Sequence, residues 1–454
     1  MSGPPSLIRD SWSTRAGFIL AAVGSAVGLG NMWRFSYVAA EGGGAAFVLL
    51  YLVFVAIIGM PLMTAEFVVG RMTQESPARA VARLGGSRWA PLGVLFVFCG
   101  LGILSYYSVI AGWTMRYTLD ALRGVMSDDA GAYFNSVGTG APAVATHLLF
   151  MAITIAIVIG GVKKGIERTS IVLMPLLFLL LAGLAVWAFT LSGSGAGYAY
   201  YLKPQLSELT NPTILANAAG QAFFSLSLGM GALMTYASYL RSKENLAREA
   251  ATVALTDFGV AFVAGLVVFP IIFHFNLGEQ IGLGEAIQDN AVGTLFIALP
   301  PALRSLGRFG DFIVAGFFIM LFFAAVTSAI SLLEVAVSAV IDSWAWTRRK
   351  AALVFGALTA LLGIPSAYNL NFLDFTDKFV GSVLLMVGGL FTCFLVGYKI
   401  LPQADAELAN GLPGVGARRA WAVLIRYVVP PLLVLVLLFS IPDLVTKLRA
   451  LMGM

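Results

Sequence analysis

Long apolar segments separated by short polar connections run through almost the whole chain. A helix needs about 20 largely apolar residues to cross a bilayer, and eleven segments come close to that length. None of the connections has room for a soluble domain. We therefore predict an all-α polytopic membrane protein with one transmembrane domain over residues 1–454, and spans at 15–39, 44–72, 90–122, 145–161, 167–191, 213–240, 249–277, 309–344, 350–365, 371–400 and 421–441.

Composition and charge support this prediction and set the orientation. Hydrophobic residues make up 59% of the chain and charged residues 11%, against roughly 25% charged in soluble domains. This nearly excludes soluble enzymes and nucleic-acid binders. With the N-terminus in the cytoplasm, 18 of the 28 Lys and Arg residues fall inside and 7 outside, so the positive-inside rule predicts a cytoplasmic N-terminus and an extracellular C-terminus. The N-terminus lacks the apolar core of a cleavable signal, so the first span should remain in the mature protein.

Reactive side chains are sparse. Cys99 and Cys393 lie in apolar stretches and define no disulfide framework. His147 and His274 are isolated, so neither a transition-metal site nor a nucleophile and base arrangement is expected. We predict that the protein is not an enzyme.

Two predicted spans carry a Gly-x-Gly sequence near their middle, at Gly28–Gly30 and at Gly229–Gly231. Glycine costs about 1 kcal/mol relative to alanine inside a helix, and a broken helix in a membrane is tolerated only where it is buried or lines a cavity. Close helix packing is the alternative, since Gly24 and Gly28 form a small-xxx-small pair. One such run in each half of a 5 + 5 arrangement favours discontinuous helices around a midplane binding site.

Polar residues inside the spans are the next candidates, because each needs a partner or a function there. Glu66 either accepts hydrogen bonds from unwound backbone or lies near the aqueous end of its span. Asp257 is either a cation ligand or a helix N-terminal carboxylate stabilised by the dipole. Thr327 and Ser328 have hydroxyls that can bind sodium, although such hydroxyls more often bond to a carbonyl of their own helix.

Charged residues near the ends of spans suggest gates. Arg34 and Asp377, together with Asp374, are expected at the same depth toward the extracellular side. Glu334 and Asp342 share one helix face, with Asp342 at the cytoplasmic end. By themselves, Tyr106–Tyr107 are better explained by packing than by function, and Phe224 and Met230 could equally be core residues.

Several sequence segments resemble the neurotransmitter:sodium symporter family, in particular its bacterial amino-acid transporters with the LeuT fold. They are WSTRAGFILAAVGSAVGLGNMWRF, EGGGAAF, PLMTAEFVVGR, SYYSVIAGW, GIERTSIVLMP, AFFSLSLGMGALMTYASYL and FLDFTDKFVGS. The resemblance covers nearly the whole chain. It implies an inverted repeat over about 15–191 and 213–400, an extra helix at about 421–441, and discontinuous first and sixth spans.

The resemblance also implies two sodium sites. In the family, a position one helical turn beyond that of Asp257 holds serine in chloride-dependent members and glutamate in some bacterial members, and this position is Ala261 here. Members usually carry Asn where this chain has Asp257, so we expect its carboxylate to replace chloride and transport to be chloride-independent. The first site maps to the carbonyl of Ala26 and the side chains of Asn31, Ser225 and Asp257; the second maps to the carbonyls of Gly24, Val27 and Ala324 and the hydroxyls of Thr327 and Ser328.

The implied substrate is an amino acid. Monoamine carriers of the family have an aspartate where this chain has Gly28, so the substrate must bring its own carboxylate, for which Tyr107 is the implied partner. An apolar lining with the adaptable Met230 favours neutral hydrophobic L-amino acids such as Leu, Ile, Phe or Trp. The site maps to Ser25, Ala26, Gly30, Ile103, Tyr107, Phe224, Ser227, Met230, Ser328 and Leu332.

Gates and a hinge complete the implied machinery. Arg34 with Asp377 resembles the extracellular gate, Gln221 an accessory gate residue, and Arg9 with Asp342, beside Trp12, the intracellular gate. Gly165 and Pro175 match a pattern that in some members lets span five unwind; the alternative is an ordinary membrane helix with a tolerated proline. Ser36 replaces the proline typical of the family.

We expect a sodium-coupled symporter that works by alternating access, in a bacterial inner membrane. Two other functions stay open from the sequence. One is an amino-acid sensor that does not transport, and the other is a transporter coupled to protons through Glu66 or Asp257. An ion channel is less attractive, because paired gates around a midplane site suit stepwise exchange.

Overall fold

The computed structural model describes residues 10–127, 129–240, 244–277, 296–412 and 414–452, and within these ranges the chain is helical and contains no strand. Among these described residues, nine stretches are long and apolar enough to cross a membrane, and each coincides with a predicted span. They are Ala45–Thr73, Ser87–Arg123, Gly140–Ile159, Val162–Phe189, Leu246–His274, Arg308–Trp344, Arg348–Tyr368, Leu370–Lys399 and Val415–Leu451.

The first predicted span is broken, as its glycines suggested. Helix α1 (Arg15–Ala26) ends where Val27 adopts an extended conformation, and the chain continues as the π-helical turn η1 (Gly30–Arg34) and α2 (Phe35–Glu41). The two parts meet at an angle of 61°. Ser36, which stands where proline is typical of the family, donates its hydroxyl to the Met32 carbonyl at 2.9 Å and lies within the helical outer half.

The sixth predicted span is also broken. Helix α11 (Pro212–Ser225) and helix α12 (Ala232–Ala237) are separated by six non-helical residues, 226–231. Ser227, Gly229 and Gly231 all have positive φ angles there, of 53°, 77° and 76°. A Cβ atom on Gly229 would lie 2.1 Å from the Leu385 carbonyl oxygen, so the close approach to α19 also requires glycine. Counting α11 and α12 as one span gives the predicted total of eleven, which stays a prediction.

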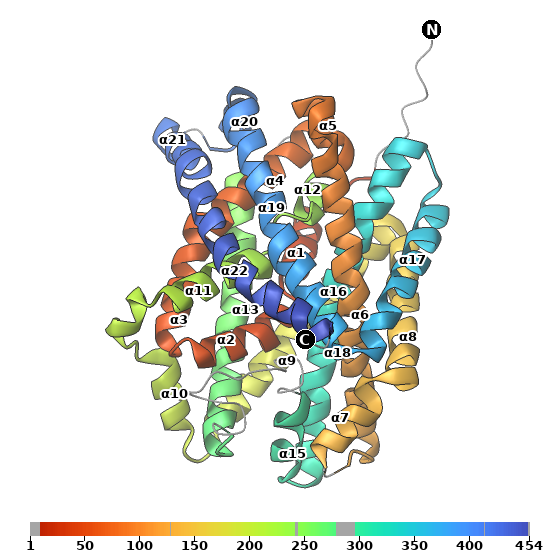
Figure 1. Cartoon of the computed structure of the whole chain (residues 1–454), viewed down its shortest axis with the longest axis vertical. Coiled ribbons are helices and arrows are strands. Elements are labelled where there is room, and N and C mark those ends of the chain that lie inside the picture. The colour runs from red at the N-terminus through yellow and green to blue at the C-terminus, as the bar shows by residue number, and fades with distance from the viewer. Residues whose placement is uncertain (1–9, 128, 241–243, 278–295, 413, 453–454) are drawn as a thin grey trace.

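The long helices form one bundle with shorter elements at both ends (Figure 1). Helices α5, α20 and α21 lie at one end, whereas α7, α10 and α15 lie at the other. Helices α6 and α16 pack along the middle, where a Cβ on Gly100 would lie 3.1 Å from the Leu332 carbonyl oxygen. The bounds are α5 Pro77–Gly85, α6 Ala90–Arg123, α7 Ala130–Gly138, α8 Gly140–Ile159, α10 Ser194–Leu202, α15 Leu299–Arg304, α16 Arg308–Trp344, α20 Leu401–Ala409 and α21 Val415–Val423.

The remaining elements connect and frame these helices. Several spans contain π-helical turns, in which the backbone hydrogen bonds join residues five apart instead of four. The bounds are α3 Ala45–Phe54, η2 Val55–Gly59, α4 Met60–Thr73, η3 Ser87–Trp89, η4 Val162–Glu167, α9 Arg168–Phe189, η5 Leu206–Thr210, α13 Leu246–His274, α17 Arg348–Tyr368, α18 Leu370–Thr376, η6 Asp377–Leu384, α19 Leu385–Phe394, η7 Leu395–Lys399, η8 Leu424–Val428 and α22 Val429–Leu451.

Apolar side chains cover the outside of the bundle as well as its inside. Leu179, Val186 and Leu361 are 69%, 68% and 64% exposed, whereas Glu66, Asp257 and Glu334 are fully buried. A soluble protein avoids this distribution, but a bilayer solvates apolar side chains directly and drives charged groups inward. The candidate site is therefore to be sought among the helices.

Candidate functional site

The two interrupted segments meet α6 and α16 around one small buried cavity, with a volume of about 30 Å³. All ten residues that the sequence assigned to substrate binding line it, although they come from four distant parts of the chain. Gly28 and Ser225 complete the lining. The predicted residues are Ser25, Ala26, Gly30, Ile103, Tyr107, Phe224, Ser227, Met230, Ser328 and Leu332.

Tyr107 reaches the break in the first helix. Its hydroxyl accepts a hydrogen bond of 3.1 Å from the Leu29 amide, one of the donors that the interrupted helix leaves unpaired. A Cβ atom on Gly28 would lie 2.9 Å from this hydroxyl and 2.8 Å from Ser328 Oγ. In this conformation, position 28 therefore has no room for a side chain that could bind an amine.

Asn31, Ser225 and Asp257 form one buried cluster beside the cavity. The Asn31 amide nitrogen donates to Ser225 Oγ at 2.9 Å and to Asp257 Oδ1 at 2.7 Å. The Ser225 hydroxyl donates to Asp257 Oδ2 at 2.7 Å. The structure thus brings together the three side chains predicted for the first sodium site, while Ala26 lines the adjoining cavity.

The surroundings of Asp257 decide one alternative and add one residue. The helix begins at Leu246 and has Glu249 in its first turn, so Asp257 lies about three turns inside it. The helix N-terminal interpretation of this carboxylate is therefore wrong. Tyr51 of α3 donates its hydroxyl to Asp257 Oδ2 at 3.1 Å. Tyr51 was not predicted, because one tyrosine within an apolar span is typical of ordinary packing.

The second predicted sodium site lies between α1 and α16. Ser328 Oγ is 3.2 Å from the Gly24 carbonyl oxygen and 3.3 Å from that of Val27. The Thr327 hydroxyl instead donates to the Ala324 carbonyl at 3.0 Å, within its own helix. The common alternative for such hydroxyls thus holds for Thr327, whereas Ser328 connects the two helices.

Two further predicted residues contact the interrupted backbone. Glu66 of α4 is fully buried and accepts a hydrogen bond of 2.7 Å from the Gly229 amide. Gln221 of α11 donates to the Gly30 carbonyl at 3.1 Å. Each of these side chains holds a backbone group that a continuous helix would satisfy internally.

At the outer end, the predicted pair of Arg34 and Asp377 forms no ion pair in the part of the chain that the structure describes. The Arg34 guanidinium lies 4.4 Å from the centre of the Phe224 ring. Asp377 accepts a hydrogen bond of 2.7 Å from the Tyr106 hydroxyl. Both charges thus lie around the aromatic residues above the cavity without closing directly on each other.

At the opposite end, the bundle is tied together by a larger set of contacts. Trp12 is 4% exposed and donates its indole N–H to the Tyr236 carbonyl at 2.9 Å. Asp342 accepts from the Ser76 amide at 2.6 Å. The prediction that Arg9 pairs with Asp342 lies outside the described residues.

A buried ion pair at this end was missed by the sequence reasoning. Glu334 receives both terminal nitrogens of Arg348, at 2.7 and 3.0 Å, and the Tyr239 hydroxyl at 2.6 Å. Arg348 also bonds to Asp10 at 2.9 Å. Arg348 is one of several basic residues in a short connection, so nothing in its sequence context distinguishes it.

The predicted hinge is wound in this structure. Gly165 lies in the π-helical turn η4, and Pro175 lies inside the continuous helix α9. Between them, Glu167 accepts hydrogen bonds from the Ser13 amide at 2.8 Å and from the Thr14 amide at 3.1 Å. The start of α9 therefore holds the start of α1.

Comparison with known proteins identifies the family. The family model described as the sodium:neurotransmitter symporter family matches residues 9–137 and 135–449. The chain belongs to this family. Its members are sodium-coupled transporters, so the chain is a multi-pass membrane protein of that class, and the resemblance drawn from the sequence motifs is confirmed.

Relatives of this symporter family are found in bacteria, archaea and animals. An uncharacterized sodium-dependent transporter, YhdH of Bacillus subtilis, is 36% identical over 94% of this chain and 96% of its own length. A sodium-dependent nutrient amino acid transporter of Drosophila persimilis is 26% identical over 78% of this chain and 63% of its own. The crystal structure of MhsT in complex with L-phenylalanine superposes with a TM-score of 0.85 at 38% identity, covering 95% of this chain and 100% of that one.

The superposition confirms the predicted fold class. An all-helical LeuT-fold bundle with two discontinuous helices is what the described residues form.

Proposed function

We propose that this family member is a symporter that couples the sodium gradient to uptake of neutral, hydrophobic L-amino acids, without chloride. The observation that carries the proposal is the meeting of ten cavity residues with a carboxylate cluster at one side and a hydroxyl and carbonyl cluster at the other. Such a site can hold a zwitterion between an exposed helix end and a cation.

The cavity lining supports an amino-acid substrate. Tyr107, whose hydroxyl accepts a hydrogen bond from the Leu29 amide in the first break, is the partner that we assign to the substrate carboxylate. Ile103, Phe224, Met230 and Leu332 supply apolar surface. MhsT, with 38% identity, was crystallised in complex with L-phenylalanine. The shared fold and the apolar lining extend that substrate class to this chain.

The present cavity volume of about 30 Å³ is close to the space that one water molecule takes in the liquid. Substrate entry must therefore widen it. The non-helical residues 226–231 and the flexible Met230 side chain lie at the wall best suited to move. We infer that substrate binding reshapes this segment. We also infer that the carrier alternates between outward-open and inward-open states, with the two gates opening one after the other.

The test is uptake of radiolabelled leucine, phenylalanine and tryptophan into proteoliposomes, in sodium and in choline at fixed pH, with lysine and glutamate as controls. Sodium-dependent accumulation of the three hydrophobic amino acids alone is expected. Accumulation in choline driven by a proton gradient would overturn sodium coupling. Binding without accumulation would favour a sensor.

A further inference from the structure

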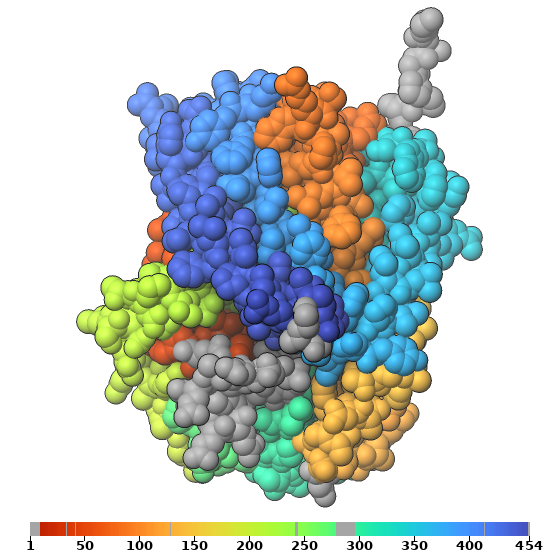
Figure 2. Space-filling view, viewed as in Figure 1, coloured from red at the N-terminus to blue at the C-terminus, as the bar shows by residue number. Residues whose placement is uncertain are grey.

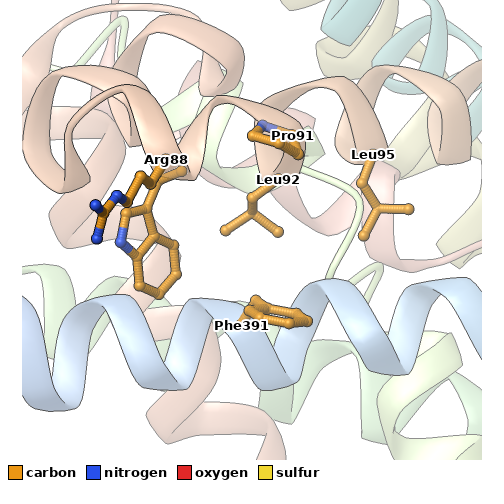
Figure 3. A pocket seen from close by; sticks show the side chains of 6 residues that line it. Arg88, Pro91, Leu92, Leu95 and Phe391 are labelled. Carbon is orange, nitrogen blue, oxygen red and sulfur yellow. The ribbon is translucent and has the colours of Figure 1, made fainter.

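A groove on the outer surface lies between the start of α6 and α19, and it shares no lining residue with the central cavity. Its volume is about 230 Å³, several times that of the central cavity. Figure 3 shows that residues from η3 and the first turns of α6 face Phe391 of α19 across it. The lining consists of Arg88, Trp89, Pro91, Leu92, Leu95 and Phe391.

The walls of the groove are fixed by packing. The Trp89 and Phe391 rings meet edge to face with centres 6.3 Å apart. Behind the groove, a Cβ on Gly93 would lie 2.5 Å from Ala78 Cα, so α5 and α6 are in backbone contact. The surfaces of α6 and α19 adjoin on this face (Figure 2). The hollow is thus a feature of tightly packed helices.

The two helices that form the groove expose apolar side chains to the lipid. Val94 and Phe98 of α6 are 68% and 51% exposed, and Phe391 of α19 is 44% exposed. These residues belong to two stretches apolar enough to span the membrane. Apolar side chains exposed at this depth are solvated by acyl chains.

One end of the groove carries a positive charge. The neighbouring Arg79 and Arg83 both pair with Glu75, at 3.3 and 3.8 Å. Arg88 is exposed and has no hydrogen-bond or ion-pair partner in the described part of the chain. Trp89 next to it is of the residue type that concentrates at the membrane interface. Arg88 therefore lies at the level of lipid headgroups.

We propose that this groove binds one anionic phospholipid, with its phosphate on Arg88 and one acyl chain along Leu92, Leu95 and Phe391. An unpaired guanidinium at one end and an apolar channel at the other match an anionic headgroup with an attached chain. The positive-inside distribution places the groove in the cytoplasmic leaflet, where anionic lipids act on basic interfacial residues. This inference does not depend on which solute the protein carries.

The test is native mass spectrometry of the purified full chain with phosphatidylglycerol or phosphatidylcholine added. Arg88→Gln should lower the occupancy of phosphatidylglycerol at least fivefold and leave the weaker binding of phosphatidylcholine unchanged. Leu95→Trp should fill the groove and reduce phosphatidylglycerol binding in the same way. Arg349→Gln removes the same charge from an exposed position at the same end of the bundle, and should bind like the original chain.

Three results would overturn the proposal. The first is equal phosphatidylglycerol occupancy in the original chain and in Arg88→Gln. The second is competition by glycerol 3-phosphate, which has no acyl chain and would assign the site to a free phosphate. The third is loss of a dimer in Leu95→Trp with lipid binding intact, which would assign the groove to a second copy of the chain.

Discussion

The two proposed sodium sites lie on either side of the same helix break but differ in charge. Asn31, Ser225 and Tyr51 surround the carboxylate of Asp257, which is fully buried. The other site offers only neutral oxygens, from Ser328, Gly24 and Val27. The protein can therefore balance the charge of a bound cation at one site without doing so at the other. On this proposal, the Asp257 carboxylate neutralises a sodium ion beside it, whereas an ion beside Ser328 depends on carbonyl dipoles.

The largest effect is expected from Asp257→Asn. A full charge close to a cation in a low-dielectric site is worth several kcal/mol, so the sodium concentration for half-maximal uptake should rise about 100-fold. Uptake should also become stimulated by chloride. Sodium titrations of leucine uptake, in chloride and in gluconate, measure both effects. Unchanged sodium affinity would show that this carboxylate is not a ligand.

Ser328→Ala should have the next largest effect. It removes a neutral oxygen, and a lost neutral hydrogen-bond group typically costs about 1 kcal/mol, so sodium affinity should fall roughly fivefold without any response to chloride. Thr327→Val is the matched comparison, because the Thr327 hydroxyl bonds within its own helix. Leucine binding, measured by scintillation proximity at increasing sodium concentrations, distinguishes the two variants. A larger loss for Thr327→Val would show that this hydroxyl leaves its helix to bind the ion.

Tyr51→Phe should have the smallest effect. The substitution keeps the charge of Asp257 and removes one of its donors, at 3.1 Å. We expect sodium affinity to fall about threefold, by roughly 0.7 kcal/mol, while uptake stays independent of chloride. Sodium titrations of leucine uptake by this variant, in chloride and in gluconate, measure both properties. A chloride requirement in Tyr51→Phe would mean that the hydroxyl, and not the carboxylate, controls anion dependence.

The break at residues 226–231 can be tested beside these sites. Gly229→Ala should destabilise the protein by more than about 1 kcal/mol, because φ is 77° and the added Cβ meets the Leu385 carbonyl. Gly259→Ala is the control, since nothing lies within 4 Å of its Cβ position. Thermal denaturation in detergent measures the melting temperatures of the two variants. Equal melting temperatures would show that the segment tolerates a side chain.

Much of the fold could be predicted because the membrane imposes a strong constraint. A span must be long and apolar, so the segment lengths could be predicted from the sequence. A mid-span Gly-x-Gly carries an energetic cost, so the breaks at Gly28 and Gly229 could be predicted as well. The cavity residues followed from family motifs. Periodicity alone did not distinguish Phe224 or Met230 from packing residues.

The partners of the charged residues could not be predicted in the same way. Tyr51 and Asp257 are 206 residues apart, and only packing of α3 against α13 brings them together. The pairing of Glu334 with Arg348 depends on how a short connection folds back. Arg34 depends on conformation, because it lies on Phe224 here and can reach Asp377 only after a side-chain rearrangement.

The central claim is that the negative charge needed beside sodium is supplied by Asp257. The most direct measurement is leucine uptake by the unmodified protein in proteoliposomes, driven by an inward sodium gradient, with chloride and then with gluconate as the only anion. The account predicts equal initial rates in the two anions and no uptake in choline. Sodium-dependent uptake that is lost in gluconate would contradict it.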